Sequence, residues 1–454
     1  MEINQRMSKR FAWLLGVVVL VSIGVLVACG TTYNASSDGL VLVGSQGSGL
    51  IETFSFNLGS GSVSAISNTP TDTANQTCVL NGVPSSLVVD PKGTFAYAII
   101  NAVSTCPGST TGLLAFKVNS SGSTNVVGSL LAFNSGTVTI QGTAATESVA
   151  VVPNTIVMDP AGKFLFVSDR ATTDGAGLPV PGSVSVFAIG SGGSVTEVAG
   201  SPFFTSSPAT TLPQSAIDIV SVAPTPTVFP AIGVNGVQNS VCSAVGLNPP
   251  TSQYLYAVDG LGNQVFEFTV DTTSGALTFS PLLPFPTDKT PVGIAVDPCD
   301  RFVYVSDSLS NKINAYTICS AVATGCPLAD GSLKAVAGSP FSLSGSASAP
   351  GPLVVDPFGN NVYVVGTLSN TVSPLKISPI SGALAPMSPA TVATGQGPMS
   401  IAVRGDDNWM FVTNFGSASP GGTVSQYAIT PATGALTAQP AIPTDNLPWG
   451  VAVK

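Results

Sequence analysis

Three aspartates stand at the same point of a repeated strand pattern, and they are the residues of this chain best placed to bind a cation. Asp169, Asp259 and Asp307 each end a short apolar strand, and Arg170 follows the first of them. Carboxylate oxygens are ligands that Ca²⁺ prefers, so the three could bind Ca²⁺ or a polyhydroxy ligand. Aspartate after a strand also caps the following turn through its own backbone, and capping is the role that we favour.

The chain has no histidine among its 454 residues. Ser-His-Asp and Cys-His catalytic arrangements are therefore excluded, and a zinc site is disfavoured because no Cys-x-x-Cys pair occurs either. A hydrolase built on this chain would need a carboxylate with a shifted pKa, or a metal bound through oxygen ligands. The sequence assigns no catalytic residue, and Ca²⁺ is the one cofactor that we consider.

The strand that carries these aspartates belongs to a pattern that occurs seven times. Its intact form is Phe302-Val-Tyr-Val-Ser-Asp307, and the variants begin at Leu40, Phe95, Phe164, Tyr254, Asn361 and Trp409. An Ile/Val-rich strand precedes six copies but not the copy at Leu40. The matching segment is residues 448–454, at the other end of the chain. We therefore predict a ring closed by its own termini, in which Trp449 to Lys454 pairs with Leu40 to Ser45.

Each repeat contains four strand-like segments joined by turn sequences. Asp90-Pro-Lys-Gly93 and Asp356-Pro-Phe-Gly359 place Asp, Pro and Gly where a type I turn favours them, and Ser-Gly pairs mark later turns. The second strand is apolar on both faces, as expected for a strand packed between neighbouring sheets. With 48 glycines, 36 prolines and 8% charged residues, the chain is predicted to be all-β, a seven-bladed β-propeller of four-stranded blades.

The N-terminus has the pattern of an export signal. Arg6, Lys9 and Arg10 precede the apolar stretch 11–27, and Leu26-Val-Ala-Cys29 resembles the lipobox of bacterial lipoproteins. We expect a signal peptide over residues 1–28, a lipidated Cys29 with a tether over 29–38, and the propeller over 39–454. An uncleaved transmembrane anchor is the alternative. Either form places the protein in the bacterial cell envelope, on a membrane and facing the periplasm or exterior.

Six cysteines follow Cys29, and an even number in an exported protein suggests disulfides. Cys319 and Cys326 flank a short insertion and are the first candidate pair. Cys78 and Cys106 are the second, because both are expected on one face of the ring. The pairing of the remaining two, Cys242 and Cys299, stays open, and Cys299 could compete for Cys319 or Cys326.

The repeats resemble the seven-bladed lactonase-like propellers, which include 6-phosphogluconolactonase-type enzymes and surface-layer proteins with a Tyr-Val-Thr-Asn repeat. The resemblance rests on the Asp-Pro-x-Gly turns, on Phe302 to Asp307, on Phe411-Val-Thr-Asn414, and on Ser-Gly-Ala-Leu at Ser274 and Ser381. It implies the propeller fold over the mature chain. Lactonases of this group use a polar cluster that contains histidine, which this chain cannot supply.

The sequence favours a binding or scaffolding module without catalytic activity, anchored to a membrane, with an unidentified protein or carbohydrate ligand. The formal net charge of −9 disfavours nucleic acid as a partner. The alternative is a lactonase-like hydrolase of sugar lactones, with or without Ca²⁺. Two longer connections, Asn134 to Val152 and Phe204 to Val241, are predicted as loops on the face where propellers usually bind ligands.

Overall fold

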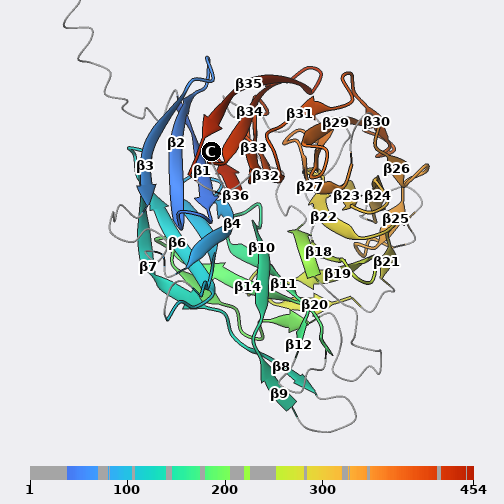
Figure 1. Cartoon of the computed structure of the whole chain (residues 1–454). Coiled ribbons are helices and arrows are strands. Elements are labelled where there is room, and N and C mark those ends of the chain that lie inside the picture. Colours follow the sequence, from blue (N-terminus) through green and yellow to red (C-terminus); the bar gives the residue numbers. More distant parts are fainter. Residues whose placement is uncertain are drawn as a thin grey trace, which may run out of the picture.

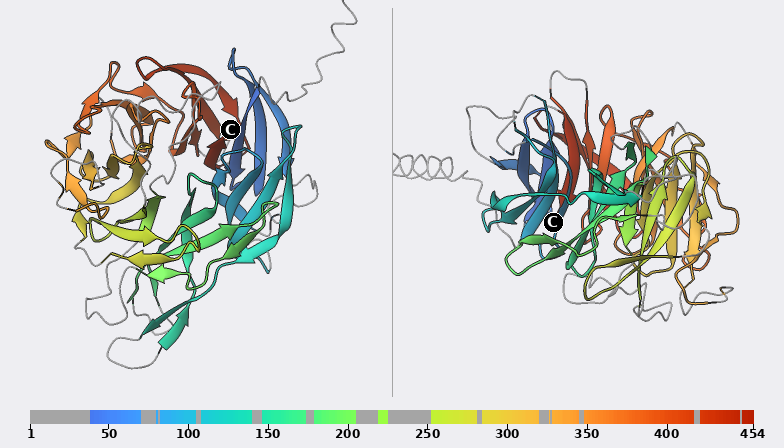
Figure 2. Two further views of the ribbon diagram at one scale, coloured as in Figure 1. Left: turned by 180° about the vertical axis from the view of Figure 1, so that it is seen from behind. Right: turned by 90° about the horizontal axis from the view of Figure 1, so that it is seen from below.

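The computed structural model shows seven antiparallel sheets arranged around a common axis (Figures 1 and 2). It describes residues 38–69, 80, 82–104, 108–139, 146–173, 179–204, 219–224, 252–280, 284–319, 326, 328–344, 348–416, 421–445 and 447–454. The inner strands of successive sheets contact one another all the way round. The predicted seven-bladed β-propeller is confirmed, and the described residues contain no helix.

The blades follow one another in sequence, and the first strand named for each blade is the one nearest the axis. Blade 1 contains β36 (Pro448–Val453), β1 (Asp38–Ser45), β2 (Leu50–Asn57) and β3 (Val63–Thr69). Blade 2 contains β4 (Val83–Val89), β5 (Phe95–Asn101), β6 (Gly112–Val118) and β7 (Thr124–Ala132). Blade 3 contains β10 (Val152–Met158), β11 (Phe164–Arg170), β14 (Ser183–Ile189) and β15 (Val195–Glu197).

Blade 4 contains β17 (Ile219–Pro224), β18 (Gln253–Asp259), β19 (Gln264–Val270) and β20 (Leu277–Phe279). Blade 5 contains β22 (Pro291–Val296), β23 (Phe302–Asp307), β24 (Lys312–Ile318) and β25 (Leu333–Ala335). Blade 6 contains β27 (Pro350–Val355), β28 (Asn361–Gly366), β29 (Thr371–Ile377) and β30 (Leu384–Pro386). Blade 7 contains β32 (Pro398–Val403), β33 (Trp409–Asn414), β34 (Thr423–Thr430) and β35 (Ala435–Pro443).

Six short strands supplement the blades. In blades 3 to 6 a two-residue strand also pairs with the third strand; these are β16 (Phe203–Phe204), β21 (Phe285–Pro286), β26 (Phe341–Ser342) and β31 (Val392–Ala393). The two remaining short strands pair with each other, β12 (Thr172–Thr173) with β13 (Pro179–Val180). A separate hairpin of β8 (Gly136–Thr139) and β9 (Thr146–Val149) projects from the ring (Figure 1). The segment 134–152, predicted as a loop, therefore contains strands of its own. The segment 204–241, also predicted as a loop, contains β17, the inner strand of blade 4.

The ring closes between its two ends, as the sequence predicts. Strand β36 pairs antiparallel with β1, and Leu42 lies opposite Ala452. Beyond the ladder, the backbone N–H of Lys454 donates to the carbonyl of Leu40 at 2.9 Å. Without β36, strand β1 would present an unpaired edge to the axis. The last residues of the chain thus supply the inner strand of the first blade.

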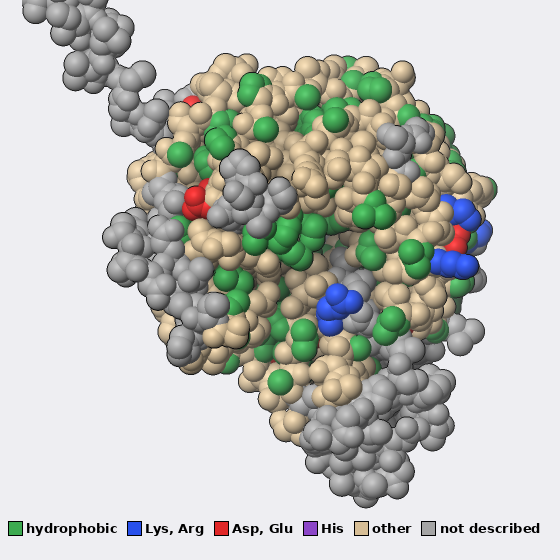
Figure 3. All heavy atoms as spheres, in the orientation of Figure 1, with side chains coloured by type: hydrophobic (Ala, Val, Ile, Leu, Met, Phe, Trp, Pro, Cys, Tyr) green, Lys and Arg blue, Asp and Glu red, His purple; other side chains and the backbone are tan. Residues whose placement is uncertain are grey.

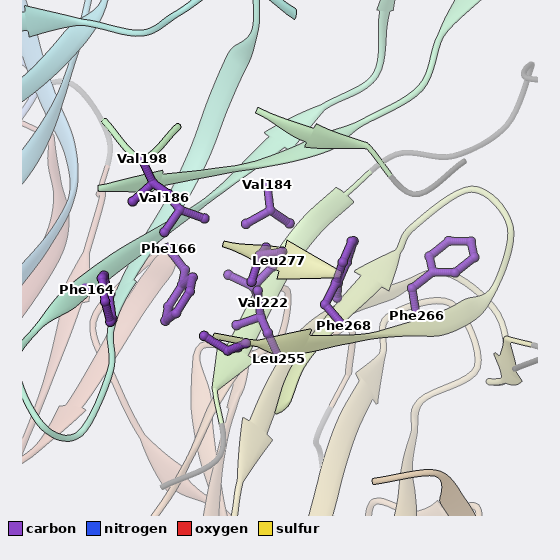
Figure 4. Packing of buried hydrophobic residues seen from close by; sticks show 12 residues of the cluster. Phe164, Phe166, Val184, Val186, Val198, Val222, Leu255, Phe266, Phe268 and Leu277 are labelled. Atoms are coloured by element: carbon purple, nitrogen blue, oxygen red, sulfur yellow. The ribbon is translucent and has the colours of Figure 1, made fainter. Parts of the chain in front are cut away.

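Side chains packed between neighbouring blades form the core. In the cluster of Figure 4, Phe164 and Phe166 of blade 3 meet Leu255 and Phe268 of blade 4, and all four are buried. The second strand of each blade contributes to both of its interfaces because its side chains alternate between the two faces of the sheet. This explains why the second strands are apolar on both faces.

Tyrosines of the second strands join neighbouring blades by hydrogen bonds. Each hydroxyl donates to the carbonyl of the glycine in the turn between the third and fourth strands of the next blade. The pairs are Tyr256 with Gly331, Tyr304 with Gly382 and Tyr363 with Gly434. These glycines have φ of 80°, 73° and 75°, where a side chain would be strained. The glycines of these turns thus accept hydrogen bonds from the neighbouring blade.

The N-terminal segment lies outside the described residues, so the predicted signal peptide, Cys29 and the tether stay predictions. No helix in the described part of the chain is long and apolar enough to cross a membrane.

Candidate binding face around the axial mouth

The antiparallel order of the strands gives the ring two different faces. We call the face where the second strands end the upper face; it carries the loops between second and third strands and the starts of the inner strands. The opposite, lower face carries the turns between first and second strands, including the Asp-Pro-x-Gly turns. Asp169, Asp259 and Asp307 all belong to the ends of second strands and so lie on the upper side.

The structure places each of these aspartates in the hydrogen bonding of its own blade. Asp169 accepts the hydroxyls of Ser183 and Ser185 at 2.9 and 2.8 Å. Asp259 accepts two backbone N–H groups of the loop that follows it, at 3.1 and 2.9 Å, which is the capping role. Asp307 accepts the side-chain amide of Asn314. Within the described residues, no three His, Cys, Asp or Glu side chains are grouped so that they could hold a metal ion.

Burial changes the protonation of two of these groups. Desolvation raises the pKa of Asp169 to about 7, although the hydroxyls of Ser185 and Ser183 act in the opposite direction. Desolvation, followed by the nearby charge of Asp288, raises the pKa of Asp307 to about 8. Arg170 is exposed at the end of β11, opposite Val152 at the start of β10. Asp169, a carboxyl that titrates near neutrality, and Arg170, a cation, therefore both lie close to the start of β10.

Glu52, on the same side of the ring, has a role that the sequence did not reveal. Its side chain is only 4% exposed and accepts the hydroxyl of Ser45 and the backbone N–H of Asp445. Desolvation raises the pKa of Glu52 to about 7. Asp445 lies just before β36, so this carboxyl fixes the connection that leads to the closing strand. No local sequence signal reveals the contact because Glu52 and Asp445 are 393 residues apart.

The inner strands begin with an irregularity at the mouth of the axis. Strands β22, β27 and β32 each start at a proline, and their pairing with the second strand shifts register directly after it. Proline is tolerated because the free edge of an inner strand faces the axis and needs no ladder partner there. Such bulges redirect side chains. One or two residues after each proline, a side chain is partly exposed: Val292, Pro352 and Met399.

These half-exposed residues divide the mouth into two arcs. Blades 2 and 3 contribute the polar Ser86 and Asn154. Blades 5, 6, 7 and 1 contribute an apolar arc, made of Val292, Pro352, Met399 and Trp449. The Trp449 ring is half-buried and meets the ring of Phe415 edge-on, with centroids 5.5 Å apart. Figure 3 shows a hollow near the centre of one face, with hydrophobic side chains on its rim and few charged ones.

Three consecutive blades each expose a leucine on the upper face. Leu261, Leu309 and Leu368 occupy the same position in the loops between second and third strands, and they are 59%, 76% and 78% exposed. Each leucine comes two residues before an asparagine in the left-handed backbone region, at φ of 55°, 61° and 54°. We call this set the leucine loops. Isolated exposed leucines are ordinary, but equivalent ones on adjacent blades form a pattern.

The asparagines hold the leucine loops in place. The side-chain oxygens of Asn263, Asn311 and Asn370 accept backbone N–H groups just before the next inner strand, at 2.7, 2.9 and 2.8 Å. Each loop is therefore tied to the following blade while its leucine projects outward. The spacing Leu-x-Asn, present three times in the sequence, was the signal that could have revealed these loops.

The structure shows that three of the six cysteines after Cys29 are disulfide-bonded. Cys319 and Cys326 form a disulfide, with Cα atoms 5.3 Å apart, which is the local pairing that the sequence favoured. Cys299 is also disulfide-bonded, and it does not compete for those two. The predicted pair Cys78 and Cys106 lies outside the described residues, as does Cys242.

Comparison with known proteins places the fold. No protein family matches the sequence, and no curated protein matches it. Two solved structures from Bacteroides, provisionally classed as 6-phosphogluconolactonases, match the chain with a TM-score of 0.61. The B. uniformis protein is 17% identical over 92% of this chain and 100% of its own; the B. fragilis protein is 18% identical over 93% and 99%.

A periplasmic gluconolactonase of Pseudomonas aeruginosa is similar to the same degree. It is 18% identical, with a TM-score of 0.60, over 92% of this chain and 99% of its own. At such identities the likeness concerns the fold and not the site. The chain therefore shares its seven-bladed propeller fold with these proteins.

Proposed function

We propose that this chain is a binding module that receives a protein partner on its upper face. The main support for this proposal is the leucine loops, because they expose three apolar side chains at equivalent positions of neighbouring blades. Contiguous exposed apolar patches mark interaction surfaces, and we propose that the three leucines together form one. The apolar arc of the axial mouth overlaps them on blades 5 and 6, which extends the same surface toward the axis.

The proposed location is the bacterial cell envelope, with the propeller held to a membrane through Cys29. The export pattern of residues 1–28 supports this placement. Strand β1 starts at Asp38 on the lower face and ends at Ser45 on the upper face. A tether before Asp38 would therefore hold the lower face toward the membrane and leave the leucine loops pointing away from it.

The leucine loops are tested by a triple substitution, Leu261→Ser, Leu309→Ser and Leu368→Ser. Cells that carry the full-length wild type are treated with a cross-linker, and the partner is identified by mass spectrometry. The control is Leu328→Ser with Ile380→Ser, which alters leucine and isoleucine side chains that are 66% and 90% exposed in turns of the lower face. We expect the control to retain the cross-linked partner and the triple variant to lose it. Equal recovery from both variants would refute the proposal.

A lactone hydrolase is the second candidate. It is supported by the fold shared with proteins named as gluconolactonases and by Asp169, whose pKa of about 7 suits a general base. In that function Asp169 would activate the water that attacks the lactone carbonyl.

Hydrolysis of glucono-δ-lactone, measured against the spontaneous rate, separates the two candidates. Activity above background that Asp169→Asn removes would establish the hydrolase, and repeating the assay with EDTA would show whether it needs a metal. If the wild type and Asp169→Asn both hydrolyse the lactone only at the spontaneous rate, the binding module is favoured over the hydrolase.

A further inference from the structure

The interface between blades 6 and 7 departs from the repeat at two positions. The first residue of the second strand is an aromatic ring in most blades, and it packs against the glycine of the next blade's turn. Phe164 does so at Gly275, and Phe302 at Gly382. In blade 6 the residue at this position is Asn361, which lies against Gly434 of blade 7. An amide thus replaces an aromatic ring inside a buried interface.

The second departure lies in the turn between first and second strands. Gly93, Gly162 and Gly359 occupy the left-handed position of this turn in their blades, with φ of 63°, 69° and 68°. Blade 7 has Asp407 there, at φ 56°, as blade 5 has Asp300, at φ 57°. Glycine is the residue that this backbone favours, so aspartate is accepted against a conformational preference. The Asp407 side chain is fully buried.

The preceding interface shows where the Asp407 side chain must point. A Cβ added to Gly359 of blade 6 would lie 2.4 Å from an Asp297 carboxylate oxygen of blade 5 and 2.6 Å from the Arg301 guanidinium. Asp407 is one blade further on, so its side chain begins beside Asp356, the equivalent of Asp297. Two buried carboxylates therefore face each other across the interface of blades 6 and 7.

Charge compensation differs between the two interfaces. Arg301 contacts both oxygens of Asp297, at 2.8 and 2.6 Å, and also donates to the carbonyl of Gly359. Blade 6 has Asn360 in place of Arg301. Buried carboxylates need a counter-charge or a proton, and the turn of blade 6 supplies no guanidinium.

Several buried acceptors at the interface of blades 6 and 7 have no protein partner, although Asp356 accepts the backbone N–H groups of Phe358 and Asn360. Both carboxylate oxygens of Asp407 are buried and accept no hydrogen bond, and Arg404 of the same turn donates to Asp406 instead. The side-chain oxygen of Asn361 also accepts none, while its amide nitrogen is bound to Asp356. Asp356, Asn361 and Asp407 are each 0% exposed. Orphaned buried acceptors of this kind indicate a missing cation or proton.

We propose that Asp356, Asn361 and Asp407 bind a calcium ion between blades 6 and 7. The donor set contains two carboxylates and one amide oxygen, which are hard ligands suited to Ca²⁺. It holds two acidic residues only, so it differs from the groups of three or more that the described residues lack. Mg²⁺ fits less well because it demands near-ideal octahedral geometry, whereas Ca²⁺ accepts flexible geometries.

The protonation of Asp407 is consistent with this site. Burial, and next the charge of Asp356, raise the pKa of Asp407 to about 8. The charge of Asp406 acts in the same direction, and that of Lys376 acts against it. A cation bound between the two carboxylates would offset their repulsion.

The test compares thermal unfolding of the propeller, residues 38–454, with EDTA and with Ca²⁺. The variant is Asp407→Gly, which restores the residue that the turn favours and is expected to fold. The matched control is Asp300→Gly, the same turn position in blade 5, where the adjoining interface has Tyr254 in place of Asn361. Direct Ca²⁺ titration by calorimetry accompanies each melting curve.

Wild type and Asp300→Gly are expected to bind one Ca²⁺ and to gain several degrees in Tm, since binding to the folded state stabilises it. Asp407→Gly should fold, bind no Ca²⁺ and show the same Tm in both conditions. Absence of Ca²⁺ binding to the wild type would overturn the proposal. Binding that persists in Asp407→Gly would also overturn it.

Discussion

The turns of the lower face and the loops of the upper face come from the same repeat, yet they have opposite surroundings. In the lower turns, charged side chains are buried against the next blade; Arg301 is 8% and Asp297 0% exposed. In the upper loops, asparagines form the inter-blade bonds and leucines stay in solvent. The turns between first and second strands thus join neighbouring blades through buried charges, whereas the upper loops join them through asparagines and also carry leucines that the ring does not need.

Removing residues 448–454 tests the ring as a whole and should have the largest effect. The deletion takes away the inner strand of blade 1 and leaves the backbone of β1 unpaired toward the axis. We expect the cooperative thermal transition to disappear and aggregation to increase, as followed by circular dichroism and light scattering. The control is a chain that starts at Asp38, which should melt like the wild type. A truncated protein with the wild-type Tm would contradict the closure.

The substitution Arg301→Met tests one buried ion pair of the lower face, between Arg301 and Asp297. This change leaves the Asp297 carboxylate buried without its partner, and such a loss costs about 3–5 kcal/mol of unfolding free energy. Urea denaturation measures it. The double variant with Asp297→Asn should recover part of the loss because no uncompensated charge is left. If the single variant were as stable as the wild type, the turn would not have the role described.

A pH series tests the buried acid of the blade 5 turn. Burial, and next the charge of Asp297, raise the pKa of Asp300 from 3.8 to about 8. Between about pH 4 and 8 the folded state therefore retains a proton that the unfolded state releases. Stability must fall as pH rises through this window, by about 1.4 kcal/mol per pH unit for each such group.

Asp300→Gly should make this pH dependence shallower by about one group, measured by urea denaturation with EDTA present throughout. Asp271→Asn is the control, since Asp271 is exposed and its pKa is lowered rather than raised. It should leave the slope between pH 5 and 8 unchanged. An unchanged slope in Asp300→Gly would show that Asp300 does not carry the proton.

The upper face should give the smallest effect on stability. Each of the three leucine-to-serine changes alters an exposed side chain, so each should shift the unfolding free energy by no more than about 0.5 kcal/mol. Urea denaturation of the triple variant measures the sum. A loss of several kcal/mol would mean that the leucines belong to the ring and are not free for a partner.

The periodicity of the sequence predicts the fold well because the same strand pattern occurs seven times. The apolar second strands, the Asp-Pro-x-Gly turns and the missing first strand before Leu40 together specify the blades, their number and the closing pair. Repetition averages out the ambiguity of any single segment. The closing strand could be identified because the repeat at Leu40 lacks its first strand, and residues 448–454 have the pattern of that strand.

The candidate sites were less predictable because they depend on departures from the repeat. Asp169, Asp259 and Asp307 attract notice as a series, but each is bound within its own blade. Asp407 and Asn361 do not form a series, and they meet only because blades 6 and 7 pack together. Contacts between distant segments, such as Glu52 with Asp445, join residues hundreds of positions apart, so no local pattern reports them.

The position of β36 also determines when the ring can be completed. Strand β36, with which β1 pairs, follows every other strand of the propeller along the chain. Blades 2 to 7 can form their own sheets as they are synthesised, but blade 1 lacks its inner strand until β36 has been made. The ring therefore closes only after the other strands of all seven blades are available.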